Sequence, residues 1–285
     1  MSSDGVTTVL SGKELAAAIR AGVATDAAAL TANGTMPTLA IVTATDDGGS
    51  AWYVSSIVKA AAKVGIAADV VDVFATPERL TAELRRLAAD PAVHGIILQT
   101  PLPGGAVLEE LAAAIPPAKD VDGASPESLG RLVAGLPAFA PATAAAVLAL
   151  LDHHEVALEG RHAVVIGRST VVGKPAAHLL LDRNATVTVC HSRTVDLPAV
   201  AATADVLVAA VGRPRLVTAG YVKPGATVVD VGTNDTADGL VGDVDAASVD
   251  GTAGGLSPVP GGVGPVTTAL LLRHTVDAAR AAVGA

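Results

Sequence analysis

Short apolar runs alternate with helical patterns in the first half of the chain, and this alternation restricts the fold more than any other feature. The apolar runs are TLAIVTA (38–44), ADVVDVF (68–74) and HGIILQT (94–100). Apolar residues at helical spacing occupy residues 10–32, 53–64 and 76–90. Thr76 is the expected N-cap of the last helix, with Pro77 at its first position. Strand–helix–strand order of this kind predicts a parallel sheet covered by helices.

A second series of strands and helices follows in the second half. Its apolar runs lie within HAVVIG, ATVTVCHSRT, ADVLVAAVG and ATVVDVGTN. Turn-forming residues cluster at 116–132, and residues 144–154 predict a helix that links two domains. We therefore expect an α/β protein with an N-terminal αβα domain (1–142) and a Rossmann-type domain (143–265), the C-terminal helix (266–285) packing back on the first.

Composition and charge exclude several classes of function. The 285 residues are 51% hydrophobic but only 2% aromatic, so small aliphatic side chains should fill the cores. A net charge of −9 argues against a general nucleic-acid binder, although a local basic pocket for a small anion stays possible. The single cysteine, Cys190, cannot form a disulfide within the chain, and we expect it to be a buried strand residue. No Cys/His spacing predicts a metal site.

The N-terminus MSSDGVTTVL has neither a basic start nor a long apolar stretch. We see no apolar run that approaches the roughly 20 residues of a membrane span. The sequence therefore predicts a cytoplasmic protein with no membrane partner.

A glycine-containing turn opens the second series. HAVVIGRSTVVGKP places Gly167 after an apolar strand and Gly173 at the start of a helix. Glycine allows close approach of the backbone, and a helix N-terminus offers free N–H groups, so dinucleotide phosphates can bind such a turn. The spacing differs from GxGxxG, and an ordinary tight strand-to-helix turn is the alternative.

The next strand ends in CHSRT, where an acidic residue would be expected if a ribose hydroxyl were bound. Ser192 and Arg193 suit a 2′-phosphate instead, and Arg168 can add a second positive charge. A solvated loop position is the alternative for Arg193 alone. The two arginines together favour NADP over NAD.

The helix at 53–64 presents a hydrocarbon beside its tyrosine. At about 100° per residue, Ile57 lies about 40° from Tyr53, whereas Lys59 points about 120° away.

QTPLPGG (99–105) follows a predicted strand, at the sheet edge where ligands of such folds bind, and is a pocket candidate.

Several stretches together resemble the bifunctional methylenetetrahydrofolate dehydrogenase/cyclohydrolase family. They occur in the family's order over nearly the whole chain: SAWYV (50–54), ILQTPLP (97–103), KDVDG (119–123), VVIGRSTVVGKP (164–175), VCHSRT (189–194), VVDVGTN (228–234), GDV (242–244) and PVPGGVGPVT (258–267). The resemblance implies a homodimeric two-domain enzyme with folate in the cleft between a catalytic and an NADP-binding domain. Such enzymes oxidise methylenetetrahydrofolate with NADP and then hydrolyse the methenyl product.

The resemblance also implies roles for individual residues. Tyr53 matches the tyrosine that stacks on folate, Asp122 the acid that grips the pterin, and Gln99 the residue that supports a catalytic lysine. Ser50 joins the expected substrate-binding residues, with Pro260 and Gly261 in the loop that closes over folate. The matching cofactor-binding positions are Gly167, Arg168, Ser169, Gly173, Ser192, Arg193, Gly212 and Thr233. Without the family, Asp120 and Asp122 could simply structure a turn, Gln99 could cap a strand end and Tyr53 could be core.

This sequence departs from the family pattern where proton transfer is expected. The family has YVxxK, whereas this chain has YVSSI, which puts Ile57 at the lysine position. PATA (141–144) replaces the usual PCTP, so Ala142 stands for a cysteine and Ala144 for a proline. Val266 replaces a methionine, which is a mild change.

These departures predict an NADP-dependent methylenetetrahydrofolate dehydrogenase with weak or no cyclohydrolase activity. A fully bifunctional enzyme is one alternative, with Lys59 replacing the missing lysine only if the helix is unwound or shifted. A pseudoenzyme that binds folate and NADP is another, and a dehydrogenase for a different small molecule is the third.

Overall fold

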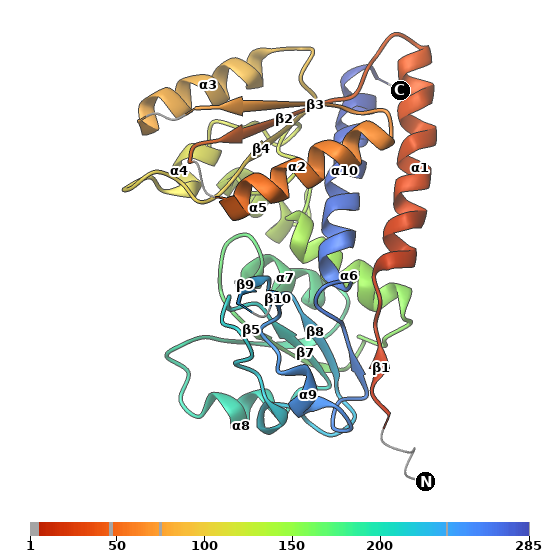
Figure 1. The fold of residues 1–285 in the computed structure, drawn as a ribbon, viewed down its shortest axis with the longest axis vertical. Coiled ribbons are helices and arrows are strands. Elements are labelled where there is room, and N and C mark those ends of the chain that lie inside the picture. Colours follow the sequence, from red (N-terminus) through yellow and green to blue (C-terminus); the bar gives the residue numbers. More distant parts are fainter. Residues whose placement is uncertain (1–5, 46–47, 74–75, 238, 285) are drawn as a thin grey trace. The chain divides into compact units, whose positions relative to one another are not determined.

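The computed structural model describes residues 6–45, 48–73, 76–237 and 239–284, and the chain forms two compact units (Figure 1). Ala17–Ala142 and Thr268–Ala285 form one of them, which we call the three-stranded unit. The N-terminal residues through Ala16 and Thr143–Thr267 form the other, which we call the six-stranded unit. Each is described by itself below.

The three-stranded unit has a parallel sheet in the order β3-β2-β4. Its strands are β2 (Thr38–Thr43), β3 (Ala67–Asp72) and β4 (Gly95–Leu98). Side chains of a strand alternate between the two faces of the sheet. Leu39 and Ile41 therefore enter a cluster with α1, α2 and α10, whereas Ala40 and Val42 enter a second cluster with α3. Figure 1 shows α2 and α3 on opposite faces of these strands.

Within the described residues, six helices contribute to this unit. They are α1 (Lys13–Ala32), α2 (Gly48–Lys63), α3 (Pro77–Ala89), α4 (Leu108–Ala112), α5 (Pro126–Val133) and α10 (Val263–Ala282). The predicted position of Thr76 as N-cap of α3 is confirmed, but its side chain accepts no capping hydrogen bond. The turn-rich segment 116–132 contains α5, which the sequence analysis missed; the Ser125 hydroxyl caps it by accepting from the Ser128 N–H.

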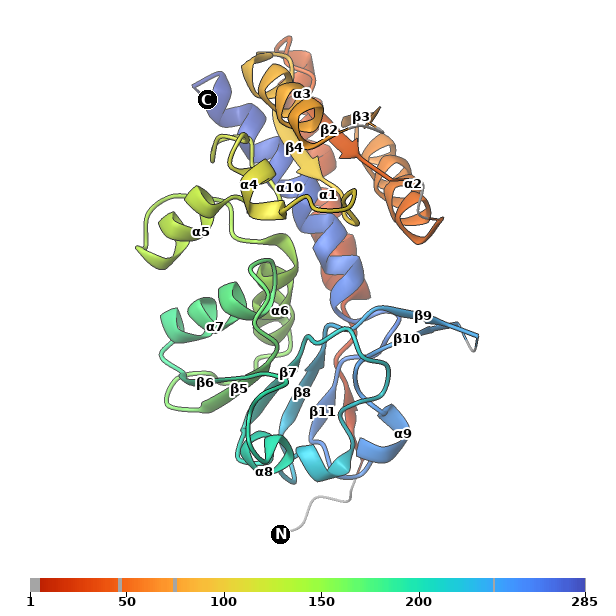
Figure 2. The ribbon, with the colours of Figure 1, turned by 90° about the vertical axis from the view of Figure 1, so that its left-hand side faces the viewer.

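The six-stranded unit has a parallel sheet in the order β1-β11-β8-β7-β5-β6. The strands are β1 (Thr8–Val9), β5 (His162–Ile166), β6 (Thr186–Cys190), β7 (Val206–Ala209), β8 (Thr227–Asp230) and β11 (Gly255–Leu256). Right-handed crossovers from β5 to β6 and back to β7 put their connecting helices on opposite faces. These helices are α7 (Gly173–Asp182) and α8 (Leu197–Ala201), and Figure 2 shows the sheet between them.

The remaining elements of the six-stranded unit are short, apart from one helix. They are α6 (Ala142–His153), the 3-10 turn η1 (Ala219–Tyr221), the antiparallel pair β9 (Asn234–Thr236) and β10 (Gly239–Val241), and α9 (Ala246–Val249). The prediction for Cys190 is confirmed, since it ends β6, is buried and forms no disulfide.

The N-terminal segment corrects the expected extent of the first domain. β1 pairs with β11 in the six-stranded sheet, and the Thr7 hydroxyl donates to the Ala253 carbonyl oxygen. The expectation of a first domain that begins at residue 1 is therefore wrong for this segment. Because β1 has only two residues, periodicity in the sequence could not identify it. Of the predicted strand 68–74, Phe74 lies outside the described residues.

One described helix, α1, is long and apolar enough to span a membrane by length and composition alone. It is not an unbroken apolar run, since Lys13, Glu14, Arg20 and Asp26 lie within it. The buried side chains Val23, Ala27 and Leu30 nevertheless belong to the core cluster of the three-stranded unit. Asp26 forms ion pairs with Arg273 and Arg280 of α10, so this helix packs on protein.

Candidate functional site

Tyr53 lies on α2 of the three-stranded unit and packs against the same core cluster as Phe139. Its hydroxyl is hydrogen-bonded to the Thr268 side chain of α10. Burial raises the pKa of Tyr53 well above its usual value, and the nearby charge of Asp122 adds to this effect. The phenol therefore stays protonated at neutral pH, with an apolar ring and a polar edge close to a carboxylate.

Asp122 lies in the KDVDG loop, whose shape depends on two neighbours. Asp120 is fully buried and accepts from the N–H groups of Ala124 and Ser125 at 3.0 and 2.9 Å, so it structures the turn. Gly123 has φ +62°, and a Cβ there would meet the Phe139 carbonyl oxygen at 2.6 Å. Only glycine fits this close approach of the two segments.

The Asp122 carboxylate itself is not used to hold the turn together. It accepts a hydrogen bond from the backbone N–H of Ala142. Burial, reinforced by the charge of Asp120, raises its pKa to about 7. A carboxyl group that changes charge near neutral pH, beside a tyrosine, is a candidate for ligand binding.

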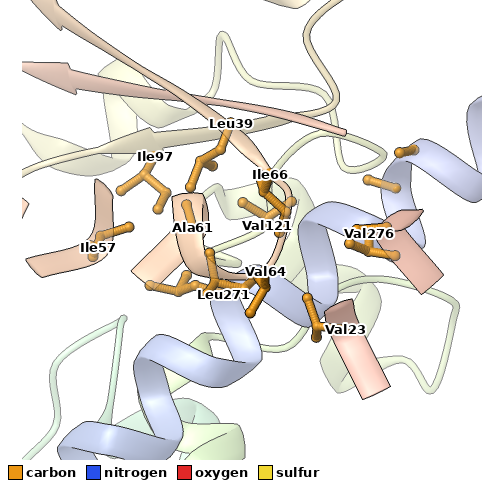
Figure 3. Close-up of a cluster of buried hydrophobic side chains, with 14 of the residues drawn as sticks. Val23, Leu39, Ile57, Ala61, Val64, Ile66, Ile97, Val121, Leu271 and Val276 are labelled. Atoms are coloured by element: carbon orange, nitrogen blue, oxygen red, sulfur yellow. The ribbon is translucent and has the colours of Figure 1, made fainter. Parts of the chain in front are cut away.

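Ile57 is completely buried, one helical turn beyond Tyr53. Figure 3 shows it in the apolar cluster that also contains Leu39, Ala61 and Ile97. Ile57 and Tyr53 lie on one face of α2, as the helical spacing predicts. Because the Ile57 side chain has no exposed surface, it is part of the core. Ala142 and Ala144 are also fully buried.

Lys59 is exposed and points to a different part of the three-stranded unit. It lines a cavity of about 490 Å³ between α2 and strands β2 and β3, together with Ser50, Ser55, Thr43 and Asp72. α2 runs unbroken from Gly48 to Lys63, so no shift in helical register brings Lys59 to the face of Tyr53. The same cavity wall holds Ser50, which the sequence analysis had placed with the substrate residues.

Gln99 follows β4 directly, and its side-chain amide donates to the Thr100 carbonyl oxygen at 2.9 Å. It is partly exposed. Its backbone N–H donates to Val42 of β2, which fixes the start of the QTPLPGG segment at the sheet edge. Gln99 is held in place locally while part of its surface remains accessible.

The glycine turn of the six-stranded unit brings two backbone segments into close contact. A Cβ on Gly173 would meet the Gly167 carbonyl oxygen at 2.2 Å, and one on Gly167 would meet the Ala210 carbonyl oxygen at 2.1 Å. The Ser169 hydroxyl accepts from the Val172 N–H at 3.2 Å, at the start of α7. This tight turn exposes Arg168 and Ser169 beside the helix N-terminus, which suits a dinucleotide phosphate.

Ser192 and Arg193 lie close to that turn because β5 and β6 are paired. Ile166 lies opposite Cys190, and the Gly167 N–H donates to the Cys190 carbonyl oxygen at 2.9 Å. The residues after both strands therefore leave the same sheet edge. The Arg193 N–H donates to His191 Nδ1 at 3.1 Å, which shapes the loop, and both Ser192 and Arg193 are exposed. Arg168 and Arg193 are thus available at one edge for an anionic ligand.

Two buried aspartates, which the sequence analysis did not single out, hold the loops that carry Gly212 and Thr233. Asp243 accepts from the N–H groups of Val211, Gly212 and Arg213 at 2.6, 3.0 and 2.8 Å. Asp230 accepts from the N–H groups of Gly232, Asp243 and Val244, each at 2.9 Å. Burial raises the pKa of Asp230 to about 6. Their positions within the quoted VVDVGTN and GDV motifs were the only signal in the sequence.

Pro260 and Gly261 lie in the loop between β11 and α10, in the six-stranded unit. Gly261 has φ +113°, and its carbonyl oxygen accepts from the Gly12 N–H at 2.9 Å. Pro260 is exposed. The structure therefore places the substrate candidates Tyr53, Gln99 and Asp122 in one unit, and this loop in the other.

Within the described ranges, no group of three or more His, Cys, Asp and Glu side chains is arranged to hold a metal ion.

Comparison with known proteins matches two family models to this chain. The catalytic-domain model of tetrahydrofolate dehydrogenase/cyclohydrolase matches residues 10–122, and the NAD(P)-binding-domain model matches residues 141–283. The chain belongs to the tetrahydrofolate dehydrogenase/cyclohydrolase family. The family confirms the predicted two-domain α/β fold.

Similar proteins cover nearly the whole length of this chain. "Bifunctional protein FolD 1" of Saccharopolyspora erythraea is 66% identical over 98% of this chain and 96% of that protein. The crystal structure of FolD from Campylobacter jejuni matches with a TM-score of 0.93 at 40% identity, covering 96% and 99% of the two chains. The Trypanosoma brucei FolD structure, complexed with NADP cofactor and inhibitor, matches with a TM-score of 0.92 at 35% identity, covering 98% and 99%.

Proposed function

We propose that this protein is an NADP-dependent methylenetetrahydrofolate dehydrogenase whose cyclohydrolase activity is weak or absent. The observation that carries the proposal is Ile57, a fully buried hydrocarbon at the position where the family pattern has a lysine. Lys59, two residues further on, lines a separate cavity, which supports the proposal that it does not replace the missing lysine.

The six-stranded unit is the proposed cofactor site. The close backbone approach at Gly167 and Gly173 leaves room for phosphate oxygens, and Ser169 orders the N-terminus of α7. Arg168 and Arg193 would bind the 2′-phosphate of NADP, which favours NADP over NAD. Ser192, Gly212 and Thr233 complete the proposed set. NADP, when bound, accepts a hydride from the substrate.

The three-stranded unit supplies the proposed folate residues. The Tyr53 ring would stack on the flat pterin, and the Asp122 carboxylate would accept hydrogen bonds from its aminopyrimidine edge. Those N–H donors would favour the charged form of Asp122 and so lower its pKa on binding. Gln99, Pro260 and Gly261 are the other proposed substrate contacts, whereas Ser50 lines the cavity that contains Lys59.

The two reactions of the family place different demands on these residues. Hydride transfer requires mainly that two carbon atoms be held in contact, and binding groups can do this without a general base. Hydrolysis of the methenyl product requires an activated water and proton transfers, for which a positioned acid or base contributes about 10²–10⁴-fold. Because Ile57 and Ala142 offer no proton, the hydrolytic step should be the weaker one.

A fully bifunctional enzyme is the second candidate. It is supported by the relatives at 66% and 63% identity, both of which are named "Bifunctional protein FolD 1". For it to hold here, a group other than residue 57 would have to move the proton.

Paired assays on the purified protein decide between these functions. We expect oxidation of methylenetetrahydrofolate with NADP, and hydrolysis of methenyltetrahydrofolate close to the spontaneous rate. Lys59→Met should change neither rate; loss of a measurable hydrolysis in that variant would identify Lys59 as the replacement. Hydrolysis well above the spontaneous rate would refute the proposal. Binding of both ligands without hydride transfer would instead identify a pseudoenzyme.

The resemblance also leads us to expect a cytoplasmic homodimer. Sedimentation equilibrium of the purified protein tests the oligomeric state directly.

A further inference from the structure

A half-buried histidine of α10, His274, touches both segments that enclose Asp122. His274 Nδ1 lies 2.8 Å from the Val121 carbonyl oxygen, in the residue directly before Asp122. The His274 ring also packs on the ring of Phe139, with centroids 4.9 Å apart and a 31° angle between the planes. Phe139 precedes Ala142, whose N–H donates to the Asp122 carboxylate. One side chain therefore contacts the loop that bears the carboxylate and the segment that binds it.

The hydrogen bond fixes the chemical form of this histidine. A carbonyl oxygen can only accept, so Nδ1 must carry the proton. Burial lowers the pKa of His274, and the charge of Arg273 acts in the same direction; the Val121 hydrogen bond and the charges of Asp277 and Asp120 oppose them. A neutral ring with its proton on Nδ1 satisfies the geometry without a buried charge.

Close packing also restricts movement of the loop that bears Asp122 and of the segment that contains Phe139. Gly123 approaches the Phe139–Pro141 backbone so closely that a Cβ would meet Pro141 N at 2.5 Å. On the other side, a Cβ at Gly95 would meet Val121 at 2.9 Å and the Thr275 hydroxyl at 3.0 Å. Small displacements of Val121 would therefore pass directly to the Asp122 carboxylate.

We infer that His274 is a positioning residue for folate binding, which sets the orientation of Asp122 through its hydrogen bond to the Val121 carbonyl group. This inference rests on the proposed role of Asp122 in folate binding. His274 does not touch substrate in this scheme; it acts only through the carboxylate.

Three substitutions separate positioning from packing. The amide nitrogen of asparagine occupies the place of a histidine Nδ1, so His274→Asn keeps the donor. His274→Gln carries the same amide one bond further out, and His274→Leu keeps most of the volume without a donor. We expect the KM for methylenetetrahydrofolate to rise about 3- to 10-fold in the Gln and Leu variants. It should stay within about 2-fold of wild type in His274→Asn, and the KM for NADP should not change in any of them.

A double-mutant cycle tests the route of the effect. In an Asp122→Asn background, His274→Gln should raise the folate KM by less than about 2-fold, because residues that act through one another are not additive. If His274→Leu does not fold, the Asn and Gln variants alone carry the comparison. Equal folate KM values for Asn, Gln and wild type would overturn the inference, as would full additivity with Asp122→Asn. Failure of wild-type protein to bind tetrahydrofolate in calorimetry would instead refute the proposed function itself.

Discussion

Ile57→Lys is the most informative single change in this protein, since it restores the amine at its family position. Ile57 has no exposed surface and lies among Leu39, Ala61 and Ile97. Removing a fully buried isoleucine costs about 1.5–3 kcal/mol of hydrophobic stabilisation. A lysine stem recovers part of this, but desolvation of the amine adds a further cost and lowers its pKa. We expect a net loss of about 2–4 kcal/mol in the free energy of unfolding.

The catalytic gain is expected in spite of this loss. Because α2 places residue 57 one turn from Tyr53, a lysine there is close to the phenol and to the electrostatic influence of Asp122. A positioned acid or base accelerates proton transfer by about 10²–10⁴-fold, and an imperfectly supported one should give at least about 10-fold. Hydrolysis of methenyltetrahydrofolate should therefore rise above the spontaneous rate, while dehydrogenase activity changes little.

Ile57→Met is the matched control. Methionine keeps the apolar volume and an unbranched stem of similar reach but has no amine, and such swaps usually cost less than about 1.5 kcal/mol. The assay follows the loss of methenyltetrahydrofolate absorbance for both variants, alongside urea unfolding. A gain in hydrolysis for both would show that side-chain shape, and not the amine, limits the reaction. No gain in hydrolysis for a folded Ile57→Lys protein would refute the reasoning and would point to Ala142 as the limiting change.

Three further predictions test the environment of Asp122, the cofactor preference and the glycine turn. The pKa of Asp122 is raised to about 7 from its usual value of 3.8, so the folded state holds this proton more tightly than the unfolded state. The free energy of unfolding should therefore fall as the pH rises from about 4 to about 7, and Asp122→Asn should remove that part of the dependence in urea titrations across this range. In steady-state assays, Arg193→Ser should lower kcat/KM with NADP by about 10- to 100-fold and leave kcat/KM with NAD unchanged. An equal loss with both cofactors would contradict the proposal that Arg193 binds the 2′-phosphate. Gly173→Ala should lower the melting temperature and the affinity for NADP, because its Cβ would meet the Gly167 carbonyl oxygen at 2.2 Å. Gly22→Ala lies on the exposed face of α1, where an added Cβ has no neighbour within 4 Å, and should instead raise the free energy of unfolding by up to about 1 kcal/mol in calorimetry. Similar losses of stability in Gly173→Ala and Gly22→Ala would show that the contact at Gly173 does not matter.

Sequence patterns were sufficient wherever contacts are local or the motif is long. The three apolar runs of the first half became β2, β3 and β4, and Thr76 with Pro77 marks the start of α3. The family motifs contain Gly167 and Arg193, and the structure shows that these residues follow the paired strands β5 and β6. Short elements such as β1 and α5 were not predicted, because two to eight residues carry too little periodicity.

The sequence by itself determined the fold class, the family and the absence of a lysine four residues after Tyr53, since all three are properties of residue order. Only the tertiary structure decided what that absence means physically: Ile57 is enclosed in the core and Lys59 faces another cavity. The structure alone also joined His274 to Val121, which are separated by 153 residues in the chain. Local periodicity describes how one element is built. Which elements meet depends on packing between distant segments, and that packing gives Asp122 its environment.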